Sequence, residues 1–130
     1  MKENGEIKVL IVDDEPGILM PLEFLMRKSG YQVYIARNGT EAKESIDQEL
    51  PQVVVLDLMM PDVDGYEVCR YLRRKTGMGQ AKVIVISAKT KEEDIRKAYE
   101  AGADAYMPKP FSTRVLVEKV KQLVDHEAES

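Results

Sequence analysis

The sequence predicts an α/β protein, with a doubly wound, five-stranded parallel sheet between two layers of helices in a three-layer sandwich. Five short β-rich runs alternate with five stretches of helical periodicity. Strict alternation of this kind favours parallel strands joined by right-handed crossovers. Three of the runs are almost continuously apolar, as strands covered on both faces should be. With 130 residues, we expect a single domain over 1–130, with an ordered core of about 7–126 and no effector domain.

The predicted strands are short segments rich in β-branched residues. They are 7–12 (IKVLIV), 31–36 (YQVYIA), 52–57 (QVVVLD), 82–87 (KVIVIS) and 103–107 (ADAYM). Short connections between strands and helices are typical of such alternating units.

The predicted helices cover 16–29, 40–49, 65–75, 91–101 and 113–126. Their apolar residues recur at helical spacing and define the faces that should pack on the sheet. These faces comprise Ile18, Leu22, Leu25 and Met26; Ala42 and Ile46; Val68, Cys69 and Leu72; and Leu116, Val120, Leu123 and Val124.

Two features bear on the helix ends and interiors. The segment Thr90-Lys91-Glu92-Glu93 matches a capping box and predicts the start of the fourth helix. Pro21 falls inside the first predicted helix. Because proline has no backbone N–H, we expect it to remove one hydrogen bond and to kink this helix.

Composition limits the classes of function. The net charge of −4 argues against nucleic acid as a direct ligand. A single cysteine, Cys69, excludes an internal disulfide and fits a reducing compartment. The first residues are polar, so we expect no signal peptide, and no apolar run is long enough to span a bilayer. We therefore expect a cytoplasmic location without a membrane partner.

Polar side chains follow the predicted strands at the point where each strand ends. In open parallel sheets, ligands bind beyond the carboxyl ends of the strands. The residues at these ends are Asp13 and Asp14 after the first strand, Asp57 at the end of the third, Ser87 at the end of the fourth and Lys109 after the fifth. Each residue alone has an ordinary alternative role, as a solvated side chain or a helix cap. Their conjunction at one rim predicts a site.

The chemistry of this rim favours phosphoryl transfer. Clustered carboxylates need a counter-charge, and Mg²⁺ is a natural one because it takes oxygen ligands and often shares its shell with a phosphate. Asp57 is placed to act as a carboxylate nucleophile that accepts a phosphoryl group as an acyl phosphate. Lys109 and the Ser87 hydroxyl would neutralise and hydrogen-bond the remaining phosphoryl oxygens.

The sequence lacks the residues that other kinds of catalytic or phosphate-binding site would need. The only histidine, His126, is near the C-terminus, where we expect it to be exposed, so a Ser-His-Asp set cannot be assembled at the rim. The segment 77–82 (GMGQAK) is glycine-rich, but it follows a helix and precedes a strand, which predicts a turn rather than a phosphate-binding loop. Cys69 lies on an apolar helix face and is expected in the core.

The chain resembles the receiver domain of bacterial two-component response regulators over essentially its whole length. The resemblance rests on VDDE after the first strand, DLMMPDVDG at the end of the third, SA at the end of the fourth, and AYMPKPF across the fifth and its loop. Each motif is weak alone, but the four in this order are specific. The resemblance implies a flavodoxin-like fold with strand order 2-1-3-4-5.

The resemblance also implies residue roles at the rim. Asp57 would be the phosphoacceptor. Asp14 would bind Mg²⁺ directly, Asp13 mainly through water, and the backbone carbonyl of Met59 would complete the protein's share of the metal shell. Asp57 itself would also be a metal ligand.

Further implied roles concern the phosphoryl group and the switch. Ser87 would hydrogen-bond the phosphoryl group, Lys109 would pair with it, and the Lys109–Pro110 bond would be cis. Gly65 would start the third helix tightly. Tyr106 would be an aromatic switch residue that moves inward with Ser87; its alternative is an ordinary tyrosine on a half-exposed edge strand.

The implied partner is a sensor histidine kinase or a phosphotransfer protein, whose phosphohistidine supplies the phosphoryl group. The domain would catalyse only its own phosphorylation and slow dephosphorylation. Output would pass through the fourth helix, fifth strand and fifth helix, to a protein partner, to an effector domain, or into a phosphorylation-induced homodimer. Met59, bulky and apolar, and Lys89 would flank the phosphoryl group, and Met59 predicts slow hydrolysis.

Two other classes share parts of this pattern. A Mg²⁺-dependent aspartyl-phosphate phosphohydrolase of the dehalogenase type also uses strand-end aspartates and a lysine. It needs a second Asp two residues after the nucleophile, where this chain has Met59. A flavin-binding domain of similar topology would place an anionic phosphate against three carboxylates, which would repel it.

Overall fold

The computed structural model describes residues 7–60 and 62–129. Strands and helices alternate along the chain. They are β1 (Lys8–Val12), α1 (Pro16–Lys28), β2 (Gln32–Ala36), α2 (Gly39–Glu49), β3 (Val53–Asp57), α3 (Gly65–Arg74), β4 (Lys82–Ser87), α4 (Glu92–Ala101), β5 (Ala105–Pro108) and α5 (Thr113–Glu129). No helix in these described ranges is long and apolar enough to cross a membrane.

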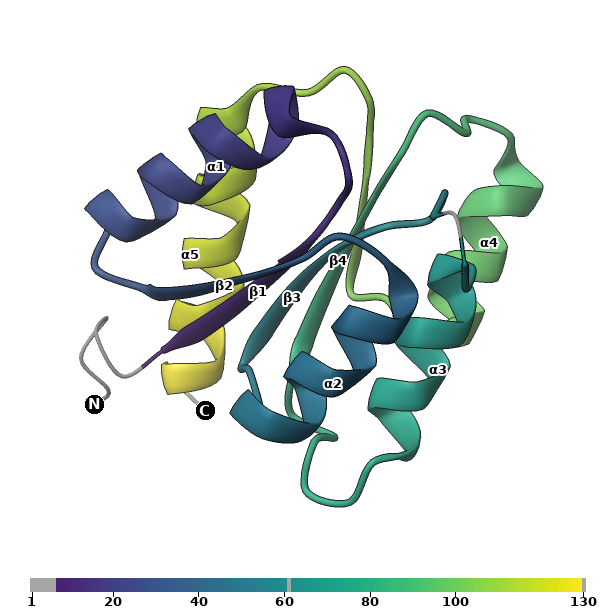
Figure 1. The fold of residues 1–130 in the computed structure, drawn as a ribbon, viewed down its shortest axis with the longest axis horizontal. Helices are drawn as coiled ribbons and strands as arrows, with labels where there is room; N and C mark the ends of the chain where they lie inside the picture. Colours follow the sequence, from purple (N-terminus) through teal and green to yellow (C-terminus); the bar gives the residue numbers. More distant parts are fainter. Residues whose placement is uncertain (1–6, 61, 130) are drawn as a thin grey trace.

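The five strands form one sheet in the order β2-β1-β3-β4-β5, and every neighbouring pair is parallel. Figure 1 shows α1 and α5 on one face of the sheet and α2, α3 and α4 on the other. The predicted fold class and the strand order implied by the resemblance are both confirmed.

Each face of the sheet has its own apolar core, because successive side chains of a strand point to opposite faces. In β1, Leu10 and Val12 belong to the cluster under α2, α3 and α4, whereas Val9 and Ile11 belong to the cluster under α1 and α5. All four side chains are fully buried. Burial on both faces explains the continuous apolar runs in the sequence.

The helix faces match the sequence patterns in α2 and α3 and differ from them in α1 and α5. In α5, Val117 is also buried, whereas Leu123 and Val124 are only partly buried. In α1, the buried side chains are Leu19, Leu22 and Met26, whereas Ile18 and Leu25 are only partly buried beside them. Leu19 therefore belongs to the core and the predicted stripe is rotated slightly. Pro21 is exposed and α1 continues through it to Lys28.

The capping box predicted at Thr90 is wrong. The N-cap of α4 is Lys91, one residue later, and it makes no side-chain capping bond. The preceding loop is fixed instead through Lys89, whose N–H donates to Ser87 Oγ and whose carbonyl accepts from the Tyr106 hydroxyl. Three acids in the first turn of α4 compensate by their favourable interaction with the helix dipole.

Strand β5 begins at Ala105, two residues after the predicted start. The reason is that Asp104 lies at the turn into the strand. Its backbone N–H donates to Val83 O at 2.8 Å and its Oδ2 accepts from Val83 N–H at 2.8 Å. The side chain of His126 lies outside the described part of α5, so its predicted exposure is untested.

Candidate functional site

The carboxyl ends of the strands bring the predicted rim residues to one edge of the sheet. Asp13 follows β1, Asp57 is the last residue of β3, and Lys109 follows β5. Since β1 and β3 are neighbours in the sheet, the two aspartates lie beside each other. Lys109 reaches them across the end of β4, and its backbone N–H donates to Ser87 O at 2.8 Å.

The Lys109 ammonium is the centre of this cluster. Nζ lies 3.1 Å from Asp57 Oδ2, 3.2 Å from Asp13 Oδ2 and 2.8 Å from Glu15 Oε1. Its side chain is only 14% exposed. Burial alone would lower the pKa of Lys109, but the hydrogen bonds and charges of Glu15, Asp57 and Asp13 raise it above the usual lysine value. Lys109 is therefore held as a cation.

Asp13 is the most deeply buried acid of the cluster. It is fully buried, and its Oδ1 accepts from the Glu15 N–H at 2.9 Å. Its Oδ2, although near Lys109 Nζ, is the one buried side-chain oxygen or nitrogen of the described residues without a hydrogen-bond partner. Burial, together with the charge of Asp57, raises the pKa of Asp13 despite the opposing effects of Glu15 N–H and Lys109.

Asp57 presents its carboxylate at the end of a buried strand. It is 3% exposed; Oδ1 accepts from Met59 N–H at 3.0 Å and Oδ2 accepts from Lys109. The start of α3 closes against it, because a Cβ on Gly65 would lie 2.8 Å from Asp57 O and 2.6 Å from Leu58 Cα. Only a glycine permits this approach.

The cluster fits a hard divalent cation. One carboxylate oxygen from each of Asp13, Asp14, Glu15 and Asp57 lies within 4.8 Å of the others. All are oxygen donors, which suits Mg²⁺. The Oδ2 of Asp13 is a second observation, since it is buried and makes no hydrogen bond, with only the charge of Lys109 Nζ at 3.2 Å beside it.

Glu15 is the residue that the sequence analysis missed. It directly precedes α1, and its carboxylate makes the shortest contact with Lys109. The available clue was the run of three consecutive acids, Asp13 to Glu15, before Pro16. Only two of the three were assigned to the site, because the direction of the third side chain depends on the turn into α1.

Ser87 and Tyr106 meet at the loop that follows β4. Ser87 is fully buried, and its Oγ accepts from Lys89 N–H at 3.0 Å. The Tyr106 hydroxyl donates to Lys89 O at 2.6 Å, and its ring packs partly buried against the core under α2, α3 and α4. The two predicted switch residues thus hold the same residue, Lys89, from opposite sides of its backbone.

Two other predicted residues have defined positions. Met59 is 58% exposed next to the cluster. The peptide bond between Lys109 and Pro110 is cis.

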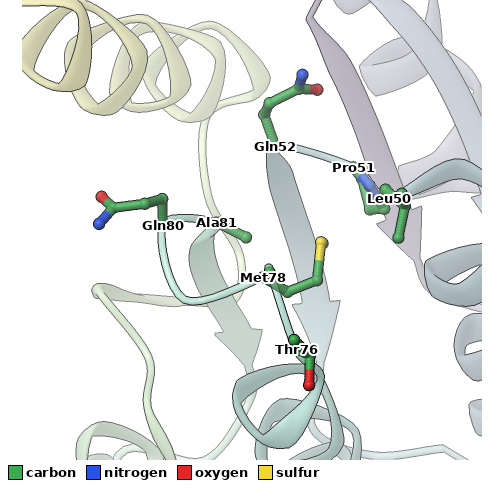
Figure 2. A pocket seen from close by; sticks show the side chains of 8 residues that line it. Leu50, Pro51, Gln52, Thr76, Met78, Gln80 and Ala81 are labelled. Carbon is green, nitrogen blue, oxygen red and sulfur yellow. The ribbon is translucent and has the colours of Figure 1, made fainter.

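A hollow of about 270 Å³ lies at the opposite edge of the sheet, before β3 and β4. Figure 2 shows its lining, which is uncharged throughout. The lining residues are Leu50, Pro51, Gln52, Thr76, Gly77, Met78, Gln80 and Ala81. This hollow has no group suited to phosphoryl chemistry, so the acidic cluster remains the candidate site.

The acid cluster and the lysine lie at the carboxyl edge of a doubly wound parallel sheet, which is where open α/β sheets bind their ligands. Residues 9–121 match the family model described as the response regulator receiver domain. The chain therefore belongs to the receiver domain family of two-component response regulators, whose members are phosphorylation-dependent signalling switches rather than conventional enzymes.

Solved structures agree with this assignment. The chain is similar to the BeF3-activated DrrB receiver domain, with 33% identity, a TM-score of 0.83, and coverage of 92% of this chain and 97% of that one. It is similar to a CheY-like receiver domain protein from Methanospirillum hungatei, with 32% identity, a TM-score of 0.83, and 95% and 98% coverage. Against DrrB of Thermotoga maritima, an OmpR/PhoB homolog, identity is 34% and the TM-score 0.83, and the match covers 93% of this chain but 54% of that longer protein.

Proposed function

We propose that this receiver domain is a Mg²⁺-dependent switch that accepts a phosphoryl group on Asp57 from the phosphohistidine of a sensor histidine kinase or phosphotransfer protein. The observation that carries the proposal is the contact of one buried ammonium, Lys109, with the carboxylates of Asp57 and Asp13. This arrangement combines a nucleophile with a fixed positive charge where phosphoryl oxygens would lie.

The metal would be held by Asp14 directly, Asp13 mainly through water, Asp57, and the backbone carbonyl of Met59. When bound, Mg²⁺ supplies charge neutralisation for the phosphoryl oxygens. The proximity of the carboxylate oxygens, and the Asp13 Oδ2 that makes no hydrogen bond, support the three aspartates of this set. Glu15 is a further acid of the cluster, and its contact with Lys109 balances that charge in the unphosphorylated protein.

In the transfer step, a carboxylate oxygen of Asp57 attacks the phosphorus of phosphohistidine. The new O–P bond forms as the P–N bond breaks, and the bond pair leaves with the imidazole. Lys109 neutralises one phosphoryl oxygen and the Ser87 hydroxyl donates to another. Ser87 Oγ now accepts from Lys89 N–H, so a movement of Oγ toward the phosphoryl group would pull on this contact while its own O–H donates.

The output would follow from that rearrangement. Ser87 and Tyr106 both contact Lys89, so a shift of the serine hydroxyl changes the loop between β4 and α4. The affected surface comprises α4, β5 and α5. It would contact a downstream protein or effector domain, or a second phosphorylated copy, in the cytoplasm.

Incubation with acetyl phosphate and Mg²⁺, followed by intact-mass measurement, tests the proposal. The parent should gain one phosphoryl mass and lose it slowly. Asp57→Asn should gain none, whereas Asp47→Asn, which removes an exposed acid on α2, should label like the parent. Equal labelling of parent and Asp57→Asn would overturn the assignment. Rapid release of phosphate from many phosphomonoesters would favour the dehalogenase-type phosphohydrolase instead.

A further inference from the structure

The loop between β3 and α3 carries Met59, and its described residues, 58–60 and 62–64, are held at two places by different contacts. Near the sheet, Met59 N–H donates to Asp57 Oδ1 and Gly65 N–H donates to Leu58 O at 3.0 Å. These bonds fix the base of the loop. Its outer part makes a separate set of contacts.

Asp62 supplies that second anchor. Its carboxylate accepts four hydrogen bonds: from Gly39 N–H at 2.8 Å, Thr40 N–H at 3.0 Å, the Thr40 hydroxyl at 2.6 Å and Val63 N–H at 2.8 Å. Gly39 and Thr40 are the first two residues of α2. Asp62 therefore ties the loop to the N-terminus of a helix more than twenty residues earlier in the chain.

The packing under this bond network is equally tight. A Cβ on Gly39 would lie 2.5 Å from Val63 Cβ, so the loop lies directly on the helix start. Asn38 caps α2 independently, since its side chain accepts from Glu41 N–H at 2.8 Å. The helix thus does not need Asp62 as its cap, and the contact is available to place the loop.

We propose that Asp62 is a positioning residue for the phosphorylation site: by clamping the loop onto α2, it fixes Met59, whose backbone carbonyl is a proposed Mg²⁺ ligand. The inference rests on the proposed function. It assigns to α2, a helix with no residue in the acid cluster, a part in metal binding. Groups that orient metal ligands from outside the metal shell contribute substantially to affinity.

The clamp requires a carboxylate. Every partner of Asp62 is a donor, and asparagine would point its own N–H₂ group at one of these donors. The same hydrogen bonds hold the pKa of Asp62 well below its usual range, and the bond from the Thr40 hydroxyl has the largest effect. Asp62 is therefore ionised wherever the protein works.

The test compares Asp62→Asn with Asn38→Ala. Both variants weaken the N-terminus of α2, but only the first releases the loop. Mg²⁺ affinity is measured by titration calorimetry with MgCl₂, and amide exchange at Met59 is followed in the metal-free protein. For Asp62→Asn we expect affinity to fall by about threefold to tenfold, and Met59 exchange to accelerate. Excess Mg²⁺ should restore the maximal rate of labelling by acetyl phosphate.

Asn38→Ala should bind Mg²⁺ within about twofold of the parent, because its loop contacts are intact. A second pair of variants controls for misfolding of Asp62→Asn. Thr40→Val removes the 2.6 Å hydrogen bond from the hydroxyl and should weaken Mg²⁺ binding. Thr40→Ser keeps a hydroxyl and should bind Mg²⁺ like the parent. If the parent binds Mg²⁺ and is phosphorylated, but Asp62→Asn and Thr40→Val match its affinity, the inference is overturned and the proposed function stands. A parent that binds no Mg²⁺ overturns both.

Discussion

The two edges of the sheet each carry one partly buried cation, but the contacts of the two cations differ. At the carboxyl edge, Lys109 is shared by Asp13, Glu15 and Asp57, and one oxygen of Asp13 still lacks a hydrogen-bond partner. At the amino edge, Arg73 at the end of α3 is fully engaged. The carboxyl edge has more negative charge than its one cation neutralises. At the amino edge, by contrast, the cation and its acceptors all have hydrogen-bond partners, and we call this edge closed and the carboxyl edge open.

Arg73 joins the two segments that lead into β4 and β5 at the amino edge. Its guanidinium donates to Gly102 O at 3.0 and 2.7 Å, to Ala81 O at 2.6 Å and to Asp104 Oδ2 at 2.8 Å. Asp104 in turn accepts from Val83 N–H. Every group in this network has its partner, so the network contributes to stability and offers nothing to a ligand. The comparison locates function where polar groups are left incomplete.

Removing the cation from the closed edge should have the largest effect. We expect Arg73→Ala to lower the free energy of unfolding by about 3 kcal/mol, because it removes the donor of the Gly102 and Ala81 carbonyls and the ion-pair partner of Asp104. Urea unfolding measures this loss. Arg73→Lys keeps the charge but not the planar fork of donors, and should recover only part of it.

The comparison also requires that the folded fraction of Arg73→Ala still binds Mg²⁺ like the parent. A loss of Mg²⁺ affinity without loss of stability would show that the amino edge is part of the functional site, and would remove the distinction between the edges.

At the open edge, the opposite pattern is expected. Asp13→Asn removes a buried charge that lacks a full set of partners and that repels Asp57. We expect this variant to be more stable than the parent in the absence of Mg²⁺, by about 1 kcal/mol, and to bind Mg²⁺ at least about tenfold more weakly. Thermal unfolding with and without MgCl₂ measures both effects.

Asp104→Asn is the matched control, since it alters a carboxylate at the amino edge that has partners. It should be less stable than the parent and bind Mg²⁺ normally. If Asp13→Asn also proved less stable without metal, the carboxyl edge would not carry the electrostatic cost inferred from its geometry.

The sequence was sufficient for the fold because three of the five strands are apolar on both faces and four of the five helices show an apolar stripe. It was also sufficient to bring Asp13, Asp57 and Lys109 together, because parallel strands deliver their carboxyl ends to one edge. It was not sufficient for Glu15, whose contact depends on the turn into α1, or for the start of α4, where loop hydrogen bonds to Lys89 overrode the capping pattern at Thr90.

The amino-edge network was unpredictable for a related reason. Arg73 looks like an ordinary charged residue at a helix end, and its partners are mainly backbone carbonyls. Backbone acceptors have no sequence signature. The same holds for the clamp at Asp62, three of whose donors are backbone N–H groups.

A smaller effect is expected where the open edge meets solvent. Met59 is exposed beside Asp57, and its side chain gives an attacking water no hydrogen bond. We expect Met59→Asn to shorten the lifetime of the phosphorylated protein by a factor of about 3, since an amide can orient that water. Loss of the phosphoryl mass over time measures the rate. Met60→Asn is unsuitable as a control because Met60 packs against the core, so Met20→Asn, on the exposed face of α1, serves instead.

The smallest effect distinguishes two kinds of acid at the same open edge. Asp62, unlike Asp13, has a donor for each oxygen, and its pKa is lowered from an ordinary value of 3.8. A carboxylate with a lowered folded-state pKa contributes stability above its unfolded pKa, and this contribution is lost as the pH falls through the folded value. The stability difference between the parent and Asp62→Asn should therefore be constant from neutral pH to about pH 5. It should shrink below about pH 4, as the unfolded chain begins to bind the proton that the folded carboxylate excludes. Urea unfolding of both proteins across this range measures the difference. A difference that grew on acidification would mean that the folded protein disfavours the ionised form of Asp62, as burial does for Asp13. The carboxyl edge would then not be divided between a clamp and a ligand site.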